Sequence, residues 1–261
     1  MKTKIIDKAG KAGKEIDLPK SFSKKIRTDI LAKVFEAQKM IQAQPYGAMK
    51  GAGAGYSASG ILKHKRHDWK SSYNKGISRI PRKIMSRNGA SFNWIGATVS
   101  STRGGRRPHA PRPEKNVFLK INKKELRLAL ESALTGTVDK KSLTKKYNKE
   151  VESGKVFVSA VLDLKTKDFL KLLQKVLGET FAIALKKKKV RSGIGKLRGR
   201  KYKRSAGLLF VIGKDESMKR KGIEVVSVPE LKISDLAPNG EPGRITCYTE
   251  SAIKEIEEQL K

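Results

Sequence analysis

The spacing of apolar side chains predicts a hairpin and then a helix at the start of the chain. Two short β-type runs, residues 2–6 and 15–18, are separated by a glycine-containing turn, as expected for an opening hairpin. Apolar side chains then recur at helical spacing over residues 28–41, with Thr28 as the predicted N-cap. Pro45 prevents this helix from continuing.

A longer alternation of helices and strands is predicted after residue 121. Asn122 and Glu125 have the spacing of a capping box, and the helix that follows has an apolar stripe formed by Leu126, Ala129, Leu130, Ala133 and Leu134. Further helices are predicted from Thr166 to Gly178, near Glu216, and after Thr249. Strands are predicted at residues 156–161, 208–212, 223–228 and 245–248.

Continuous apolar strands separated by amphipathic helices are typical of an α/β fold. The expected architecture is a mostly parallel central sheet flanked by helices, with a long extended, non-globular insertion. The single cysteine, Cys247, falls in the last apolar run and is predicted to be a buried strand residue. One cysteine excludes an intramolecular disulfide and most zinc ribbons.

Residues 46–113 interrupt this alternation and differ from it in composition. We find no persistent helical or strand period there, although the segment contains ten of the 23 glycines, both tryptophans and all three histidines. It has 14 Lys and Arg residues against one acid, Asp68. We therefore predict two parts, a globular domain of residues 1–45 and 114–261, and an extended basic loop of residues 46–113.

The charge balance indicates a polyanionic partner. The chain has 59 Lys and Arg residues against 25 Asp and Glu, a formal net charge of +34, which exceeds what solubility requires. A membrane is not expected as a partner, because no stretch approaches the roughly 20 apolar residues of a spanning helix. The first residues lack the apolar core of a secretory signal, so we expect a cytoplasmic protein.

The positive charge is concentrated rather than spread. A second acid-free block, residues 186–204, has 11 Lys and Arg residues, whereas residues 215–261 have ten acids against seven bases. Ordering the long insertion would cost roughly 70–130 kcal/mol of backbone entropy, which its sparse apolar side chains cannot recover alone. Folded RNA can supply the difference through phosphate contacts and through base stacking on Trp69, Tyr73, Phe92 and Trp94.

Motifs for catalysis or metal binding are weak. The glycine-rich run at residues 51–55 has neither a strand before it nor a helix after it, and no Gly-Lys-Ser/Thr phosphate loop occurs. His64, His67 and Asp68 lack further ligands nearby, so RNA contact is the better interpretation than a metal site. The sequence therefore predicts no enzyme activity, no metal and no cofactor.

Several ordered motifs resemble one known family, the fourth protein of the large ribosomal subunit in its archaeal and eukaryotic form. The Gly-Gly-Arg-Arg run at residues 104–107, with His109 after it, is similar to that family's signature. Further similar stretches are residues 76–82, 114–115, 120–125, 195–203, 225–228, 235–238 and 243–251. Three departures are the order Arg-Pro-His-Ala-Pro around His109, a connection at residues 213–222 that is shorter than usual, and residues 61–69, which have no counterpart.

The resemblance implies a structural constituent of the large subunit that binds ribosomal RNA early in assembly. It also implies that the insertion lines the nascent polypeptide exit tunnel, with neighbouring large-subunit proteins and the nascent chain as further partners. Together with the charge pattern, it gives the expected RNA-binding residues: Lys63, Lys65, Arg66, Trp69, Lys75, Arg79, Arg82, Lys83, Arg87, Trp94, Arg103, Gly104, Gly105, Arg106, Arg107, His109, Arg112, Lys189, Arg191, Lys196, Arg198, Arg200, Lys201, Lys203 and Arg204.

Three alternatives stay open from the sequence alone. The insertion can be a flexible basic loop that never orders, as is common for this composition. The chain can be an α/β RNA-modifying enzyme, such as a methyltransferase, although the glycine-rich turn after the first strand is missing. It can also regulate its own messenger RNA.

Overall fold

The central sheet of the computed structural model has mixed direction but is mostly parallel. The model describes residues 2–58, 71–73, 76–151, 154–185, 188–220 and 222–260. In the order β2-β1-β5-β10-β8-β9, all neighbours pair in parallel except β1 and β2, which form the predicted antiparallel hairpin. The strands are β1 (Lys2–Ile6), β2 (Ala12–Asp17), β5 (Lys155–Phe157), β8 (Leu209–Ile212), β9 (Glu224–Ser227) and β10 (Thr246–Thr249).

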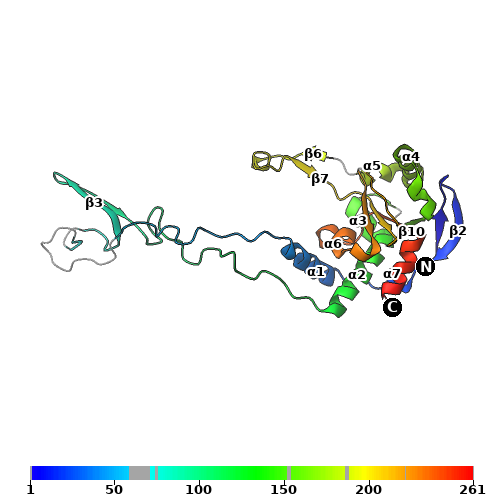
Figure 1. Ribbon diagram of the computed structural model, residues 1–261, viewed down its shortest axis with the longest axis horizontal. Coiled ribbons are helices and arrows are strands. Elements are labelled where there is room, and N and C mark those ends of the chain that lie inside the picture. The colour runs from blue at the N-terminus through cyan, green and yellow to red at the C-terminus, as the bar shows by residue number, and fades with distance from the viewer. Residues whose placement is uncertain are drawn as a thin grey trace. The chain divides into compact units, whose positions relative to one another are not determined.

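Successive strand residues point to opposite faces of this sheet, and helices cover both faces (Figure 1). Leu209 and Val211 join one buried cluster, whereas Phe210 and Ile212 join the other. Side chains of α1 (Thr28–Ile41), α2 (Lys123–Val138), α6 (Ile233–Leu236) and α7 (Glu250–Leu260) belong to the first cluster. Side chains of α3 (Lys140–Tyr147), α4 (Thr166–Leu177) and α5 (Phe181–Ala184) belong to the second. The α/β prediction is confirmed.

Short 3₁₀ turns join these elements. They span Lys20–Ser23, Ser159–Asp163, Gly178–Thr180, Ile194–Lys196, Val228–Glu230 and Pro238–Gly240. Two predicted caps are correct: the Asn122 N–H lies 3.5 Å from Glu125 Oε2, and the Ala252 N–H donates to Thr249 Oγ1 at 3.3 Å. Thr28 and Thr166, in contrast, are the first helical residues rather than the caps.

Two predicted elements are wrong in part or entirely. The strand expected at residues 156–161 ends at Phe157, because β1 offers no strand partner beyond Ile6, and Ser159–Asp163 turns into a 3₁₀ helix. The helix expected near Glu216 is a turn, in which the Gly213 N–H donates to Glu216 Oε2 at 2.8 Å. The side-chain hydrogen bond therefore replaces helical backbone bonds.

Two side chains expected in the core are exposed. Ile41 is 64% exposed and Leu126 is 44% exposed. Both lie near helix ends, beyond the residues that form the buried faces of α1 and α2. Helix α3 was not predicted from the apolar pattern, since Leu143 is its one buried residue. The signal for it is polar: Asp139 caps α3 by accepting the Ser142 N–H at 3.0 Å.

Cys247 is fully buried in β10, as predicted. Burial raises the pKa of its thiol to about 12, so the reactive thiolate is suppressed in the folded protein. The neighbouring Tyr248 is also fully buried, and its hydroxyl lies 2.9 Å from Thr137 Oγ1 on α2. This pair links the sheet to the helix layer with its polar atoms satisfied.

The contacts divide the chain into two units, residues 1–42 with 118–261 and residues 43–117. The second unit contains a two-stranded hairpin, β3 (Arg82–Asn88) with β4 (Ser91–Gly96), where we predicted no strand. The missed signal is a two-residue turn after Asn88 between two runs of β-type residues. A separate hairpin in the first unit pairs β6 (Lys188–Val190) with β7 (Tyr202–Arg204).

Candidate nucleic-acid interface

Two segments of the insertion run side by side. The Ala48 N–H donates to the Pro111 carbonyl at 3.4 Å, and a Cβ added to Gly47 would lie 2.5 Å from Pro113 Cδ. Further along, Gly53 packs against the backbone of Gly105. Residues 47–53 therefore lie beside residues 105–113, and we call these two segments the paired stem.

The Arg82 side chain holds together a group of neighbouring segments of the insertion. Its side chain donates to the Ser78 carbonyl at 2.7 Å, to the Ile80 carbonyl at 3.2 Å and to Ser72 Oγ at 3.3 Å. Arg82 is 7% exposed, and its guanidinium lies 5.7 Å from the ring centre of Trp94. This environment lowers the pKa of Arg82 through burial. The position favours an internal role for Arg82 over a phosphate contact.

The Gly-Gly-Arg-Arg signature closes a tight loop that follows β4. The Gly105 N–H donates to the Thr102 carbonyl at 3.0 Å, and the Arg106 N–H donates to the Thr98 carbonyl at 3.0 Å. A Cβ on Gly105 would lie 1.9 Å from the Val99 carbonyl oxygen, and Gly104 has a φ of +71°. A larger residue at either position would strain or block this loop, so both glycines are needed to form it. The loop in turn sets the backbone positions of Arg106 and Arg107.

The remaining described cations of the insertion are available to a partner. Arg79, Arg103, Arg106, Arg107, His109 and Arg112 are exposed, and Lys83 is partly exposed. Two of them lie over tyrosine rings: Arg79 is 4.4 Å from the Tyr73 ring centre, and Lys83 is 4.1 Å from that of Tyr56. Tyr56 was missed by the sequence reasoning, because nothing in its local sequence indicates its pairing with Lys83.

Several predicted site residues lie outside the described part of the chain. They are Lys63, His64, Lys65, Arg66, His67, Asp68, Trp69 and Lys75. The side chains of Arg87 and Phe92 lie outside it as well, although both backbones belong to the β3–β4 hairpin.

The second predicted RNA-binding block forms a hairpin, which we call the basic hairpin (residues 188–204). It pairs only with itself and stands apart from the central sheet (Figure 1). Lys189, Lys196, Arg198, Arg200, Lys201, Lys203 and Arg204 are exposed along it. Arg191 is partly buried, and its Nε donates to the Arg200 carbonyl at 3.2 Å. A half-exposed Tyr202 lies among these cations and was also missed.

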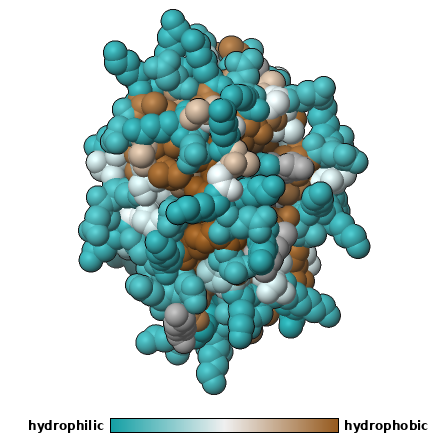
Figure 2. All heavy atoms as spheres, turned by 90° about the vertical axis from the view of Figure 1, so that its right-hand side faces the viewer, coloured by the Kyte–Doolittle hydropathy of each residue, from teal (hydrophilic) through white to brown (hydrophobic). Residues whose placement is uncertain are grey.

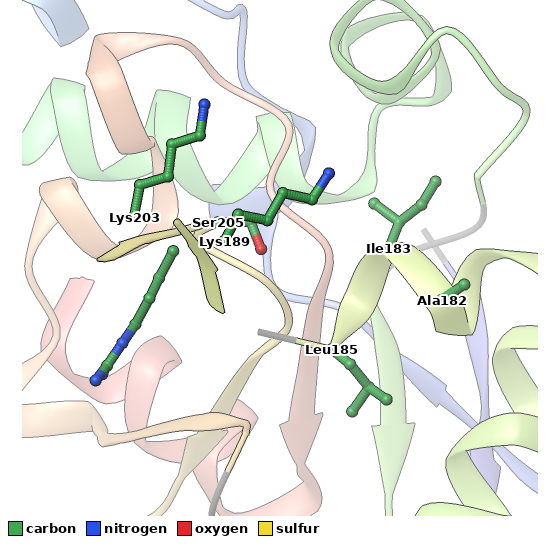
Figure 3. A pocket seen from close by; sticks show the side chains of 7 residues that line it. Ala182, Ile183, Leu185, Lys189, Lys203 and Ser205 are labelled. Atoms are coloured by element: carbon green, nitrogen blue, oxygen red, sulfur yellow. The ribbon is translucent and has the colours of Figure 1, made fainter. Parts of the chain in front are cut away.

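A hollow of about 400 Å³ lies between the basic hairpin and α5. Figure 3 shows the Lys189 side chain extending toward Ile183 on α5, with Lys203 beyond Lys189 and Leu185 on another side of the hollow. Its lining therefore combines apolar side chains with the cations of the hairpin.

Figure 2 shows one face of the molecule, on which hydrophilic side chains surround smaller apolar areas.

Two of the protein's own carboxylates lie at the carboxyl edge of the parallel strands, where α/β enzymes bind ligands. Glu216 Oε2 accepts the Thr249 hydroxyl at 2.7 Å, and Glu255 accepts the Lys214 N–H at 2.9 Å. Burial alone would raise the pKa of Glu216, but hydrogen bonds from Ser159, Ser251 and Thr249 outweigh it and lower the pKa. A phosphate or acidic cofactor at this edge would meet a fixed negative charge.

Among the described residues, no group of three or more His, Cys, Asp or Glu side chains could hold a metal ion. None of the described helices is both long enough and apolar enough to cross a membrane.

Comparisons with known proteins agree with the resemblance of the motifs. A model of the ribosomal protein L4/L1 family matches residues 16–259. The chain is 34% identical to large ribosomal subunit protein uL4 of Nanoarchaeum equitans over 94% of this chain and 93% of that protein. It is 32% identical to the protein of the same name from Archaeoglobus fulgidus over the full length of both, and 35% identical to that of Methanococcoides burtonii over 97% and 96%. The chain therefore belongs to the ribosomal protein L4/L1 family, whose members are structural proteins rather than enzymes.

Proposed function

We propose that this chain is a structural constituent of the large ribosomal subunit in the cytoplasm, where its insertion and its basic hairpin bind ribosomal RNA. Family membership supports the ribosomal assignment, since the relatives named above are large-subunit proteins. The observation that supports the RNA contacts is the exposure of almost all described cations in these two segments, against one acid in the insertion and none in the hairpin.

The apolar residues of the insertion support a partner that covers them. Several large apolar side chains in the described part of the insertion are exposed, among them Tyr46 at 76% and Met49 at 83%. The buried residues of the described insertion are mostly small or polar: Ser71, Ser72, Arg82 and Ala97. Hydrogen bonds and turns thus shape the insertion, while RNA would supply the missing burial.

We further propose that the insertion reaches through ribosomal RNA and lines the nascent polypeptide exit tunnel. The paired stem supports this proposal, because a path that leaves and returns together can pass between RNA helices. In this account the chain binds ribosomal RNA early in assembly, and neighbouring large-subunit proteins and the nascent polypeptide are its further partners. Binding to its own messenger RNA is a second candidate, which the same basic surfaces would permit.

We expect the affinity for large-subunit ribosomal RNA to fall steeply with salt. Each phosphate contact contributes about 0.7–0.9 to the slope of log affinity against log salt concentration, because counterions are released. Fluorescence-anisotropy titrations of the full chain over a salt series would measure this slope. Arg106→Gln should lower the slope by about one contact and weaken binding.

Lys254→Gln is the matched control for that variant. It removes one charge from α7, where Lys254 Nζ lies 3.0 Å from Glu250 Oε1, outside both proposed surfaces. The control should leave affinity and slope unchanged. A flat salt dependence of the unaltered chain, or equal effects of the two variants, would contradict the proposed phosphate contacts.

A further inference from the structure

Two large apolar side chains stand at the tip of the basic hairpin. Ile194 is 65% exposed, and Leu197 is 87% exposed. Scattered exposed leucines are normal on protein surfaces, but these two lie on a two-stranded hairpin outside the central sheet. A two-stranded hairpin alone is only marginally stable in water, so a partner that covers its apolar tip would stabilise it.

The tip has a defined conformation. Ile194 begins a 3₁₀ turn, and the Leu197 N–H closes the turn on the Ile194 carbonyl at 3.0 Å. Gly195 accepts backbone N–H groups from Arg198 at 3.3 Å and from Arg200 at 3.0 Å. Arg191 lies against this turn, since a Cβ on Gly195 would be 2.8 Å from Arg191 Cδ. The turn is therefore supported from within the hairpin.

This geometry places the two apolar side chains together. Residues three apart in a 3₁₀ turn lie nearly above one another, so Ile194 and Leu197 share one side of the tip. A pre-formed pair loses little further conformational freedom on binding. The tip is suited to insertion into a partner.

The surrounding charge identifies the class of partner. Lys196, Arg198 and Arg200 are exposed beside the apolar pair, and the basic hairpin contains no acid. Unpaired RNA presents apolar base faces next to phosphates at every nucleotide, which matches this arrangement. An apolar protein surface would leave the cations without counter-charges.

We propose that Ile194 and Leu197 form an apolar wedge that contacts unstacked bases of large-subunit RNA, while the neighbouring cations bind the flanking phosphates. The proposal rests on the function proposed above and adds a mode of base contact to it. Phosphate contacts fix position, whereas contacts to bases depend on RNA structure.

The test compares RNA binding by the full chain and by the double variant Ile194→Ser with Leu197→Ser. We expect about tenfold weaker binding to large-subunit ribosomal RNA at every salt concentration, with the salt slope unchanged. Lys196→Gln should instead lower the slope. Binding to a perfectly paired RNA duplex, which offers no unstacked bases, should respond to Lys196→Gln but not to the double variant.

Leu128→Ser serves as the matched control, because Leu128 is 47% exposed on α2, away from the hairpin. Leu197→Met should retain affinity, and unchanged circular dichroism and melting temperature would show that the variants fold. Unaltered RNA binding by the double variant would overturn the wedge and indicate a protein partner at the tip. A lower salt slope for the double variant would also overturn the wedge. Salt-independent binding by the unaltered chain would instead refute the proposed function.

Discussion

Deletion of residues 47–112, with Tyr46 joined to Pro113, is expected to leave a folded α/β protein that has lost most of its RNA affinity. Both buried clusters consist of residues outside 43–117, so the deletion removes no residue of either cluster. The junction is short, because Gly47 already packs against Pro113. Thermal unfolding should therefore remain cooperative, with a similar melting temperature.

The loss of affinity should be on the order of a hundredfold or more. The deletion removes Lys50, Arg79, Arg103, Arg106, Arg107 and Arg112, all of which are exposed. If these six cations contact phosphates, the salt slope should fall by about 4 to 5. Titration of large-subunit ribosomal RNA over a salt series measures both quantities. Loss of cooperative melting would contradict the division into two units, and retained affinity would contradict the role of the insertion.

Replacement of Arg244 by methionine should cost about 3–5 kcal/mol of unfolding free energy. The Arg244 side chain is 2% exposed, lies 2.5 Å from the Glu224 carboxylate, and donates to the carbonyls of Asp235, Ala206 and Gly207 at 2.6–3.0 Å. Methionine fills a similar volume but leaves these four acceptors without their donor. Urea denaturation followed by circular dichroism would measure the change.

Arg27→Met is the control for this variant. Arg27 pairs with Asp29 at 2.7 Å, but both side chains are more than half exposed, so stability should hardly change. Because Ala206 and Gly207 connect β7 to β8, Arg244 also anchors the end of the basic hairpin. Equal stability of Arg244→Met and the unaltered protein would show that the buried network contributes nothing.

Sequence reasoning predicted the parts of this fold that follow from repeated apolar spacing. The strands around Leu209 and Cys247 and helices α1, α2, α4 and α7 were all recognised, because each buries several apolar side chains at a regular period. Elements held by polar interactions were missed. Helix α3 depends on the Asp139 cap, and the turn at Glu216 depends on a carboxylate that accepts a backbone N–H.

The candidate interface was predictable in charge but not in geometry. The two basic segments can be located from composition alone, because a run of Lys and Arg residues is visible in the sequence without knowing which residues are in contact. Composition could not distinguish Arg82, whose guanidinium is turned inward, from the exposed Arg106. It also gave no indication that Arg79 would lie over Tyr73, or that Gly105 is required by contact with Val99. These distinctions depend on residues brought together by folding.

Ultraviolet cross-linking of the assembled large subunit, with cross-linked peptides identified by mass spectrometry, would show whether the insertion and the basic hairpin contact ribosomal RNA. We expect cross-links to ribosomal RNA at Tyr56, Tyr73 and Tyr202, in the insertion and the basic hairpin. The buried Tyr248 should give none. Cross-links confined to the acidic residues 215–260, with none from the insertion or the hairpin, would contradict the proposed RNA contacts.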